Sequence, residues 1–269
     1  ADTKIVADNG NSIFSNNTVT NNGVTEKNDI YIVSNTYSTI NVTPDENNWN
    51  MVPSIDATQE KFNPVTLSLE AKNNGTISFD GTIDGEATYS KAILDEDFEY
   101  ETEKLDTPYA YNLDITGDDT GRVIFKNDVK NANVTIADTN VYFDTRDNIF
   151  DGNNLTLKSG MLSMVNGGVG VSALNTFTIS GDTNFVADVN LQDQTMDRIT
   201  ADTYGAHTGN LNVVGMNILN DAPVGRDTTE IFFAETGLMD NVVNGTGELP
   251  DSNYQVALTP IYKYNVGYE

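Results

Sequence analysis

The chain of 269 residues contains no cysteine, one histidine and one tryptophan. Without cysteine it can form neither a disulfide framework nor a thiol nucleophile. Positive charge is also scarce, because 14 Lys and Arg stand against 40 Asp and Glu, which gives a formal net charge of −26. Binding to phosphates requires clustered cations. The composition therefore argues against nucleic acid or an anionic membrane as a partner, and it is compatible with divalent cations at the surface.

Long apolar runs are missing as well. No apolar run of about 18 residues, the length that a membrane-spanning helix needs, occurs in the sequence. The chain begins at Ala1, with no Met and no apolar leader. We therefore expect a mature chain from which an export signal has been removed. Any attachment to a membrane would require a segment outside this sequence.

Short runs in which apolar and polar residues alternate dominate the sequence, and they are densest over 111–191. Alternation over four to six residues predicts a strand with one buried and one solvated face. Asn, Asp and Gly between the runs allow tight corners. The runs follow one another so closely that no helix fits between them. The predicted core residues are Leu113, Ile115, Val123, Phe125, Val134, Ile136, Val141, Phe143, Leu155, Leu157, Phe177, Ile179, Phe185 and Ala187.

An internal repeat indicates how these strands are arranged. The segment GTISF at 75–79 matches GRVIF at 121–125 in its Gly and in its alternating apolar positions. Stacked copies of one short unit are the sequence signature of a solenoid. The many brief strands favour an all-β parallel β-helix over a sandwich, which needs fewer and longer strands joined by hairpins.

The chain is predicted to form a single domain with three parts. Residues 1–64 form irregular N-terminal rungs, 65–220 the regular stack, and 221–269 a C-terminal cap or junction. Within the first part, 44–64 reads as a longer connection fixed by Trp49. Two longer strands are expected in the last part, at 230–234 and across 254–266.

Residues 84–106 interrupt the stack and are expected to form a loop or hairpin that leaves it. Nine carboxylates fall in these 23 positions, and they repel one another. One interpretation is a solvated acidic face. The other is calcium binding, because hard cations require clustered oxygens. The candidate calcium ligands are Asp95, Glu96 and Asp97, and no other cofactor is predicted.

No residue is assigned a catalytic role. The single histidine, His207, lies in a turn context and is expected to be exposed, and no nucleophile elbow accompanies it. Carboxylate pairs can cleave glycosidic bonds, although acids at solvated corners are the simpler interpretation. The candidate acids are Asp118, Asp119, Asp144, Asp147 and Asp151. The candidate basic proton acceptors are Arg122, Lys126, Arg146 and Arg198.

Residues 188–218 carry a further pattern, in which Asp197 and Ile199 are followed by Gly209, Leu211 and Val213. The segment resembles the last rungs of the passenger domain of a bacterial autotransporter, a type V secretion protein. This resemblance implies a right-handed β-helix outside a Gram-negative cell, either extracellular or at the outer-membrane surface. It also implies a C-terminal outer-membrane barrel in the full-length protein.

Three functions are compatible with the sequence. The first is a non-enzymatic passenger that acts as an adhesin or display scaffold and binds a host-surface, matrix or carbohydrate ligand. The second is a β-helix enzyme that degrades polysaccharides. The third is a structural surface protein that assembles with copies of itself.

Overall fold

The structure, a computed structural model, describes residues 2–21, 23–43, 54–59, 61–93, 99–221, 231, 254–258 and 263–266. All regular elements within these ranges are β-strands. The described part of the chain contains no helix long and apolar enough to cross a membrane. The all-β class predicted from the sequence is confirmed.

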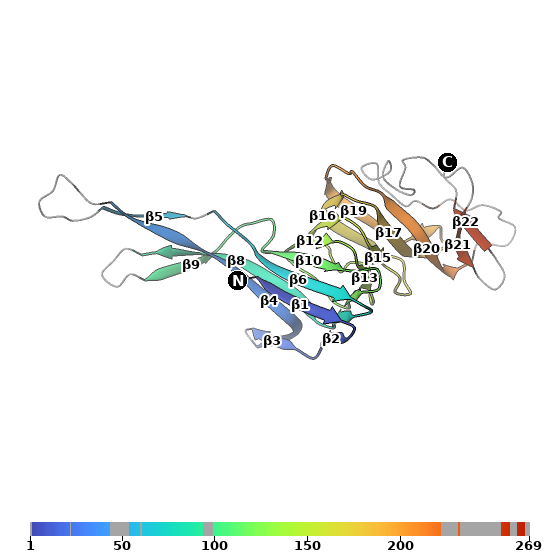
Figure 1. Cartoon of the computed structure of the whole chain (residues 1–269), viewed down its shortest axis with the longest axis horizontal. Helices are drawn as coiled ribbons and strands as arrows, with labels where there is room; N and C mark the ends of the chain where they lie inside the picture. Colours follow the sequence, from blue (N-terminus) through green and yellow to red (C-terminus); the bar gives the residue numbers. More distant parts are fainter. Residues whose placement is uncertain are drawn as a thin grey trace, which may run out of the picture.

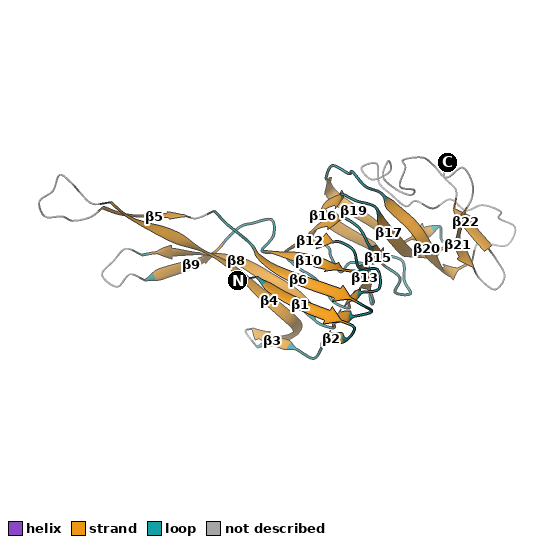
Figure 2. Ribbon diagram, viewed as in Figure 1, coloured by secondary structure: helices purple, strands orange, loops and turns teal. Residues whose placement is uncertain are grey.

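Two sheets, A and B, form the body of the molecule (Figure 1, Figure 2). All of their pairings are parallel except that between β18 and β17. Sheet A contains, in spatial order, β1 (Thr3–Asp8), β6 (Val65–Lys72), β10 (Tyr111–Gly117), β12 (Ala132–Ile136), β14 (Asn154–Leu157), β16 (Val171–Ile179) and β19 (Arg198–Tyr204). Sheet B contains β18 (Thr195–Met196), β17 (Thr183–Asn190), β15 (Met161–Ser163), β13 (Asn140–Phe143), β11 (Arg122–Phe125), β7 (Thr76–Phe79) and β2 (Asn11–Phe14), and β20 (Leu211–Asn220) also pairs with β17.

Consecutive strands from β10 to β17 alternate between the two sheets. A rung is defined here as one strand of sheet A and the next strand of sheet B. The two copies of the internal repeat lie in successive strands of sheet B, with Thr76 opposite Arg122 and Phe79 opposite Phe125. The repeat predicted from the sequence is therefore a structural repeat in register.

The core lies between the two sheets and is filled by the inward side chains of each rung. All of the predicted core residues are buried. Aromatic rings continue this core from rung to rung. Phe79 stacks on Phe14 at 4.8 Å and on Phe125 at 5.6 Å between ring centroids, and Phe150 meets Phe125 and Phe143 edge-on.

A further sheet contains the two longest described strands, of 20 and 11 residues, and part of it extends away from the body (Figure 1). Its strands are β3 (Thr18–Asn21), β4 (Val24–Thr43), β5 (Ser54–Gln59), β8 (Thr82–Ala92) and β9 (Tyr100–Lys104). Strand β4 runs parallel to β8 and then antiparallel to β5, while β9 runs antiparallel to β8. Strands β4, β5, β8 and β9 are called the arm below.

Two expectations about the irregular segments need correction, and a third is met. The stretch 84–106 does contain a hairpin, formed by β8 and β9. The stretch 44–64 is not only a connection, because β5 within it pairs with β4. Trp49 lies outside the described residues.

The expected single strand over 254–266 is two antiparallel strands, β21 (Tyr254–Leu258) and β22 (Lys263–Val266). Of the strand expected at 230–234, the structure describes only Ile231, which is not in a strand.

Candidate functional site

Three carboxylates are buried together where the sheet B strands return to sheet A. Asp147 lies between β13 and β14, Asp188 in β17, and Asp197 between β18 and β19. Asp188 and Asp197 are completely buried, and Asp147 is 8% exposed. Together these three residues are called the carboxylate cluster.

The carboxylate cluster fastens the loop of residues 164–170, between β15 and β16, to its neighbours. One oxygen of Asp188 accepts hydrogen bonds from the backbone N–H groups of Asn166 at 2.8 Å and Gly167 at 2.7 Å. Asp197 accepts from the N–H of Gly170 at 3.0 Å. The Asn166 side chain donates to Asp147 at 2.7 Å. Asp188 and Asp197 therefore pair with backbone N–H groups of this loop, and Asp147 with one of its side chains.

Burial and mutual repulsion change the protonation of the carboxylate cluster. Burial, reinforced by the charges of Asp147 and Asp188, raises the pKa of Asp197 to about 8. Burial also raises the pKa of Asp147 to about 6, against the hydrogen bond from Asn166 that lowers it. Removing a carboxylate from water disfavours its charged form. Asp197 therefore holds a proton at neutral pH.

The carboxylate cluster is not arranged as a metal centre. Within the described residues, no group of three or more Asp, Glu or His side chains is placed to hold an ion. The predicted calcium ligands Asp95, Glu96 and Asp97 lie outside the described residues. The prediction of a calcium site there therefore remains a prediction.

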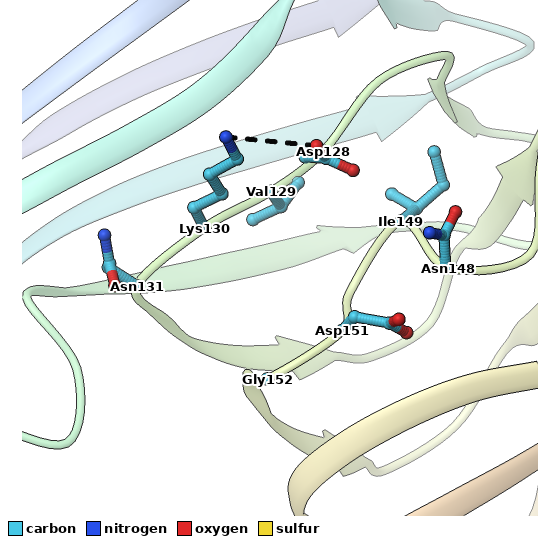
Figure 3. Close-up of a pocket in the computed structure, with 8 residues that line it drawn as sticks. All are labelled: Asp128, Val129, Lys130, Asn131, Asn148, Ile149, Asp151 and Gly152. Atoms are coloured by element: carbon cyan, nitrogen blue, oxygen red, sulfur yellow. Dashed lines mark ion pairs between the residues drawn. The ribbon is translucent and has the colours of Figure 1, made fainter.

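A pocket lies against the turns that lead from sheet B back to sheet A. Its volume is about 380 Å³, and Figure 3 shows its lining residues. Asp128 pairs with the guanidinium of Arg146 and lies 4.0 Å from the amine of Lys130. Asp151 accepts a hydrogen bond from the Ala173 N–H at 2.8 Å, and burial raises its pKa. Both acids of the pocket thus already have partners.

The acids considered for glycoside cleavage lie in two different sets of turns, which connect the two sheets in opposite directions. Asp118 and Asp119 lie in the turn from β10 to β11, which leads from sheet A to sheet B. Asp144, Asp147 and Asp151 lie in the connection from β13 to β14, which leads from sheet B to sheet A. The structure therefore does not bring the five acids to one face.

The five acids were expected to lie at solvated corners of the chain, and this is right for some of them and wrong for one. Asp119 and Asp144 are exposed. Asp118 accepts hydrogen bonds from the backbone of Asn73, Thr120 and Gly121, and these bonds lower its pKa to about 2. Asp147 is buried, because its loop folds inward against Asn166.

The basic residues considered as proton acceptors have other roles in the structure. Lys126 pairs with Asp80 at 2.9 Å, and this contact raises the lysine pKa. Arg146 pairs with Asp128, and the Arg122 guanidinium lies 5.8 Å from the centre of the Tyr142 ring. Arg198 is the first residue of β19, and its backbone N–H donates to the carbonyl of Gly170. The side chains of Lys126, Arg146 and Arg122 thus contact groups within the stack.

His207 is partly buried and not the exposed turn residue that was expected. Its Nδ1 atom accepts a hydrogen bond from the Ile179 N–H at 2.9 Å. The rings of Phe177 and Tyr204 lie 6.1 Å and 6.2 Å from it. An imidazole whose Nδ1 accepts from the backbone joins two rungs in the same way as the Asn and Asp side chains do.

The arm carries a row of exposed aromatic and apolar side chains that the sequence analysis did not identify. Tyr31, Val33 and Tyr37 occupy alternate positions of β4 and are 51%, 48% and 57% exposed. Tyr100 of β9, 50% exposed, meets Tyr37 edge-to-face at 5.7 Å. These four residues are called the aromatic face. The signal that could have revealed it is Tyr or Val at positions 31, 33 and 37, with Ser or Thr at 34, 36 and 38.

Polar side chains on the same side of the sheet as the aromatic face join its strands. The Asn35 amide donates to Ser90 at 3.0 Å and accepts from Thr88 at 2.8 Å. Ser90 is in turn 2.8 Å from Thr102, oxygen to oxygen. The side chain of Glu86 hydrogen-bonds Tyr31; burial, and then this carboxylate, raise the tyrosine pKa. The network spans β4, β8 and β9 and holds the exposed rings in place.

Comparison with known proteins supplied no relative, because no family model, curated protein or solved structure matches this chain.

Proposed function

We propose that this chain is a non-catalytic display protein, in which a right-handed parallel β-helix supports the arm and the arm binds a surface ligand. The observation that carries the proposal is the aromatic face, with four large side chains about half exposed on an extended sheet. Contiguous apolar surface on a folded domain marks a place where something binds. Tyr is favoured at such contacts because it combines a large ring with a polar tip.

Two features support the β-helix. Strands alternate between two parallel sheets, and equivalent residues pair in register from rung to rung. Parallel strands joined by a crossover connection are right-handed in nearly all proteins. A stack of this kind supports a projecting sheet without needing a catalytic cleft.

The proposal retains the cellular setting that the passenger resemblance implies. It places the chain outside a Gram-negative cell, where a host-surface, matrix or carbohydrate ligand is accessible. The support is compositional: the absence of cysteine and the net charge of −26 suit a soluble exposed protein. No nucleic acid partner is proposed.

An adhesion assay tests the proposal. Beads coated with the protein are counted on immobilised matrix proteins, mucins, polysaccharides and epithelial cells. The test variant replaces Tyr31, Tyr37 and Tyr100 by Ser. Loss of central aromatic anchors typically costs about 1–4 kcal/mol at an interface. We therefore expect the variant to lose about tenfold or more of the adhesion that the unmodified protein shows.

The matched control replaces Val6, Ile13 and Val214 by Ser. These residues are also exposed but lie on strands of the body. The control should adhere as the unmodified protein does. Adhesion that is absent, or that both variants retain equally, would contradict the display function.

Polysaccharide cleavage is the second candidate, and the pocket that holds Asp128 and Asp151 is the observation that favours it. Reducing-sugar release from neutral and acidic polysaccharides measures it directly. Turnover that disappears in both Asp128→Asn and Asp151→Asn would replace the display function by an enzymatic one.

A further inference from the structure

Strand β9 is an edge strand of the arm. One of its edges pairs with β8, and no strand within the described ranges pairs with its outer edge. In the β8–β9 ladder, Tyr100 lies opposite Ala92 and Lys104 opposite Thr88. The N–H of Ile93 donates to the carbonyl of Glu99, and that of Leu105 to the carbonyl of Ala87. The odd-numbered residues of this segment therefore bond to β8.

It follows that the even-numbered residues of β9 direct their main chain away from β8. Residues of an antiparallel pair alternate between those that exchange hydrogen bonds with the partner strand and those that do not. Tyr100, Thr102 and Lys104 thus present their N–H and C=O groups at the outer edge. Such a row is a template for another extended chain.

The side chains of β9 divide into two faces of different chemistry. Tyr100 and Thr102 belong to the side of the aromatic face, as the contacts of Tyr100 with Tyr37 and of Thr102 with Ser90 show. Glu101 and Glu103 alternate with them and point to the opposite side. All five residues of β9 are exposed. Lys104 lies on the same side as Tyr100, and Lys91 of β8 lies opposite Glu101. An added strand would meet aromatic surface and one lysine on one side. On the other side it would meet two carboxylates, of which Glu103 has no lysine opposite it in β8.

We propose that the outer edge of β9 binds an extended basic segment of a partner protein, which joins the arm as an additional strand. Main-chain hydrogen bonds with Thr102 and its neighbours provide the attachment, and alternate side chains provide the selection. Lys or Arg side chains of the partner lie opposite Glu101 and Glu103. The intervening side chains cover Tyr100. The inference rests on the display function proposed above and names the class of partner.

Charge separates this partner from a second copy of the chain. Pairing β9 with another β9 would place Glu101 and Glu103 of one copy beside the same residues of the other. Like charges on neighbouring strands are destabilising. Two chains that each carry a net charge of −26 also repel one another as a whole. A basic segment removes both penalties.

The first experiment tests the main-chain contact. Fluorescence anisotropy measures the binding of a labelled peptide of about eight alternating Lys and Thr residues, a typical strand length, to the full chain. Thr102→Pro removes an outward N–H without removing a bond to β8, and edge strands tolerate proline at such positions. We expect it to weaken binding about tenfold or more.

Thr102→Val is the matched control. It removes the same hydroxyl and keeps the N–H, so binding should stay close to that of the unmodified protein. Circular dichroism and thermal unfolding establish that both variants are folded. Equal binding by the Pro and Val variants, or no binding of the peptide to the folded unmodified protein, overturns the proposal.

The second experiment separates the edge from bulk charge. The double variant Glu101→Lys, Glu103→Lys and the double variant Glu26→Lys, Asp202→Lys change the net charge equally. Glu26 and Asp202 are exposed and lie away from β9, in β4 and β19. Only the first should abolish binding. Equal losses in both would show attraction to the whole acidic molecule, and would overturn the proposal.

The adhesion assay shows which of the two proposals fails. Adhesion that needs the aromatic face but survives Thr102→Pro retains the display function and removes the edge contact. Self-association in sedimentation experiments that Thr102→Pro abolishes would make the partner a second copy and overturn the basic segment. Peptide binding at β9 without adhesion to any surface would retain the edge contact and remove the display function.

Discussion

The carboxylate of Asp197 accepts a hydrogen bond from the backbone N–H of Asp188 at 2.6 Å, and neither residue is exposed to solvent. The backbone also closes the contact in the other direction, since the N–H of Asp197 donates to the carbonyl of Asp188 at 3.0 Å. Two acidic side chains are thus held next to each other in the protein interior. Burial of the Asp197 carboxyl, and then repulsion from Asp147 and Asp188, raise its pKa and favour its protonated form, which makes stability depend on pH.

We predict that the free energy of unfolding falls as the pH rises from about 6 to about 8. The folded-state pKa of Asp197, about 8, lies above its ordinary value of 3.8, so only the folded state holds this proton in that range. The stabilisation from this group is complete below the unfolded pKa and is lost as the pH rises through the folded pKa. One such proton corresponds to a slope of up to about 1.4 kcal/mol per pH unit. Urea denaturation across the range measures it.

The control for this pH dependence is a side chain that cannot titrate. Asp197→Asn should flatten the slope between about pH 6 and about pH 8, whatever its effect on absolute stability. The exposed Asp202→Asn should leave the slope unchanged. Stability of the unmodified protein that is constant or rises through this range would contradict the assignment of the proton.

We predict that Asn153→Leu destabilises the fold by about 2–4 kcal/mol, because it leaves two buried main-chain groups without partners. Asn153 is 2% exposed; its oxygen accepts from the Ala132 N–H at 2.8 Å and its amide donates to the Val129 carbonyl. Asn148→Leu, at an exposed position five residues earlier, should change stability by about 0.5 kcal/mol or less. Similar losses for the two variants would contradict a bridging role of Asn153.

The core of the stack could be predicted from the sequence, because its cause is local. Each short run places residues such as Val123 and Phe125 on one face by alternation alone. The match between 75–79 and 121–125 then fixes which strands stack in register, as the pairing of Phe79 with Phe125 confirms. Where the alternation of apolar and polar residues decides which side chains are buried, the sequence is enough to predict the core.

The arm and the carboxylate cluster could not be predicted, because their causes are not local. The single strand β4 pairs in parallel with β8, more than 40 residues away, and no pattern within 24–43 specifies that partner. Likewise Asp147 resembles the neighbouring Asp144 in the sequence. Only the fold brings Asn166 to one of them and leaves the other in solvent.

We predict that Gly160→Ala is far more harmful than Gly152→Ala. Both glycines have positive φ, +88° and +74°, so a β-carbon introduces backbone strain of about 1–2 kcal/mol in each case. At Gly160 that carbon would also lie 2.2 Å from the carbonyl oxygen of Thr139, whereas at Gly152 nothing lies within 4 Å. The same carbonyl accepts the N–H of Met161 between rungs. Thermal unfolding of the two variants provides the comparison, and equal losses would contradict the close approach.

The last prediction concerns the continuity of the stack. Phe125 is completely buried, with Phe79 at 5.6 Å in the preceding strand of sheet B and Phe150 at 5.4 Å in the connection from β13 to β14. Phe125→Ala should cost about 3–5 kcal/mol through lost burial and the resulting cavity. Because the residue joins successive rungs, the loss should also uncouple the two sides of the stack.

Urea denaturation distinguishes such uncoupling from a simple loss of stability. Where stacked repeats contact only their neighbours, cooperativity depends on those contacts. The dependence of the free energy of unfolding on urea reports the surface exposed in one transition. For Phe125→Ala we expect a shallower urea dependence or two transitions. Phe125→Leu retains apolar volume and should keep a single transition with a smaller loss. A single transition of unchanged urea dependence in Phe125→Ala would show that the rungs on either side remain coupled without this ring.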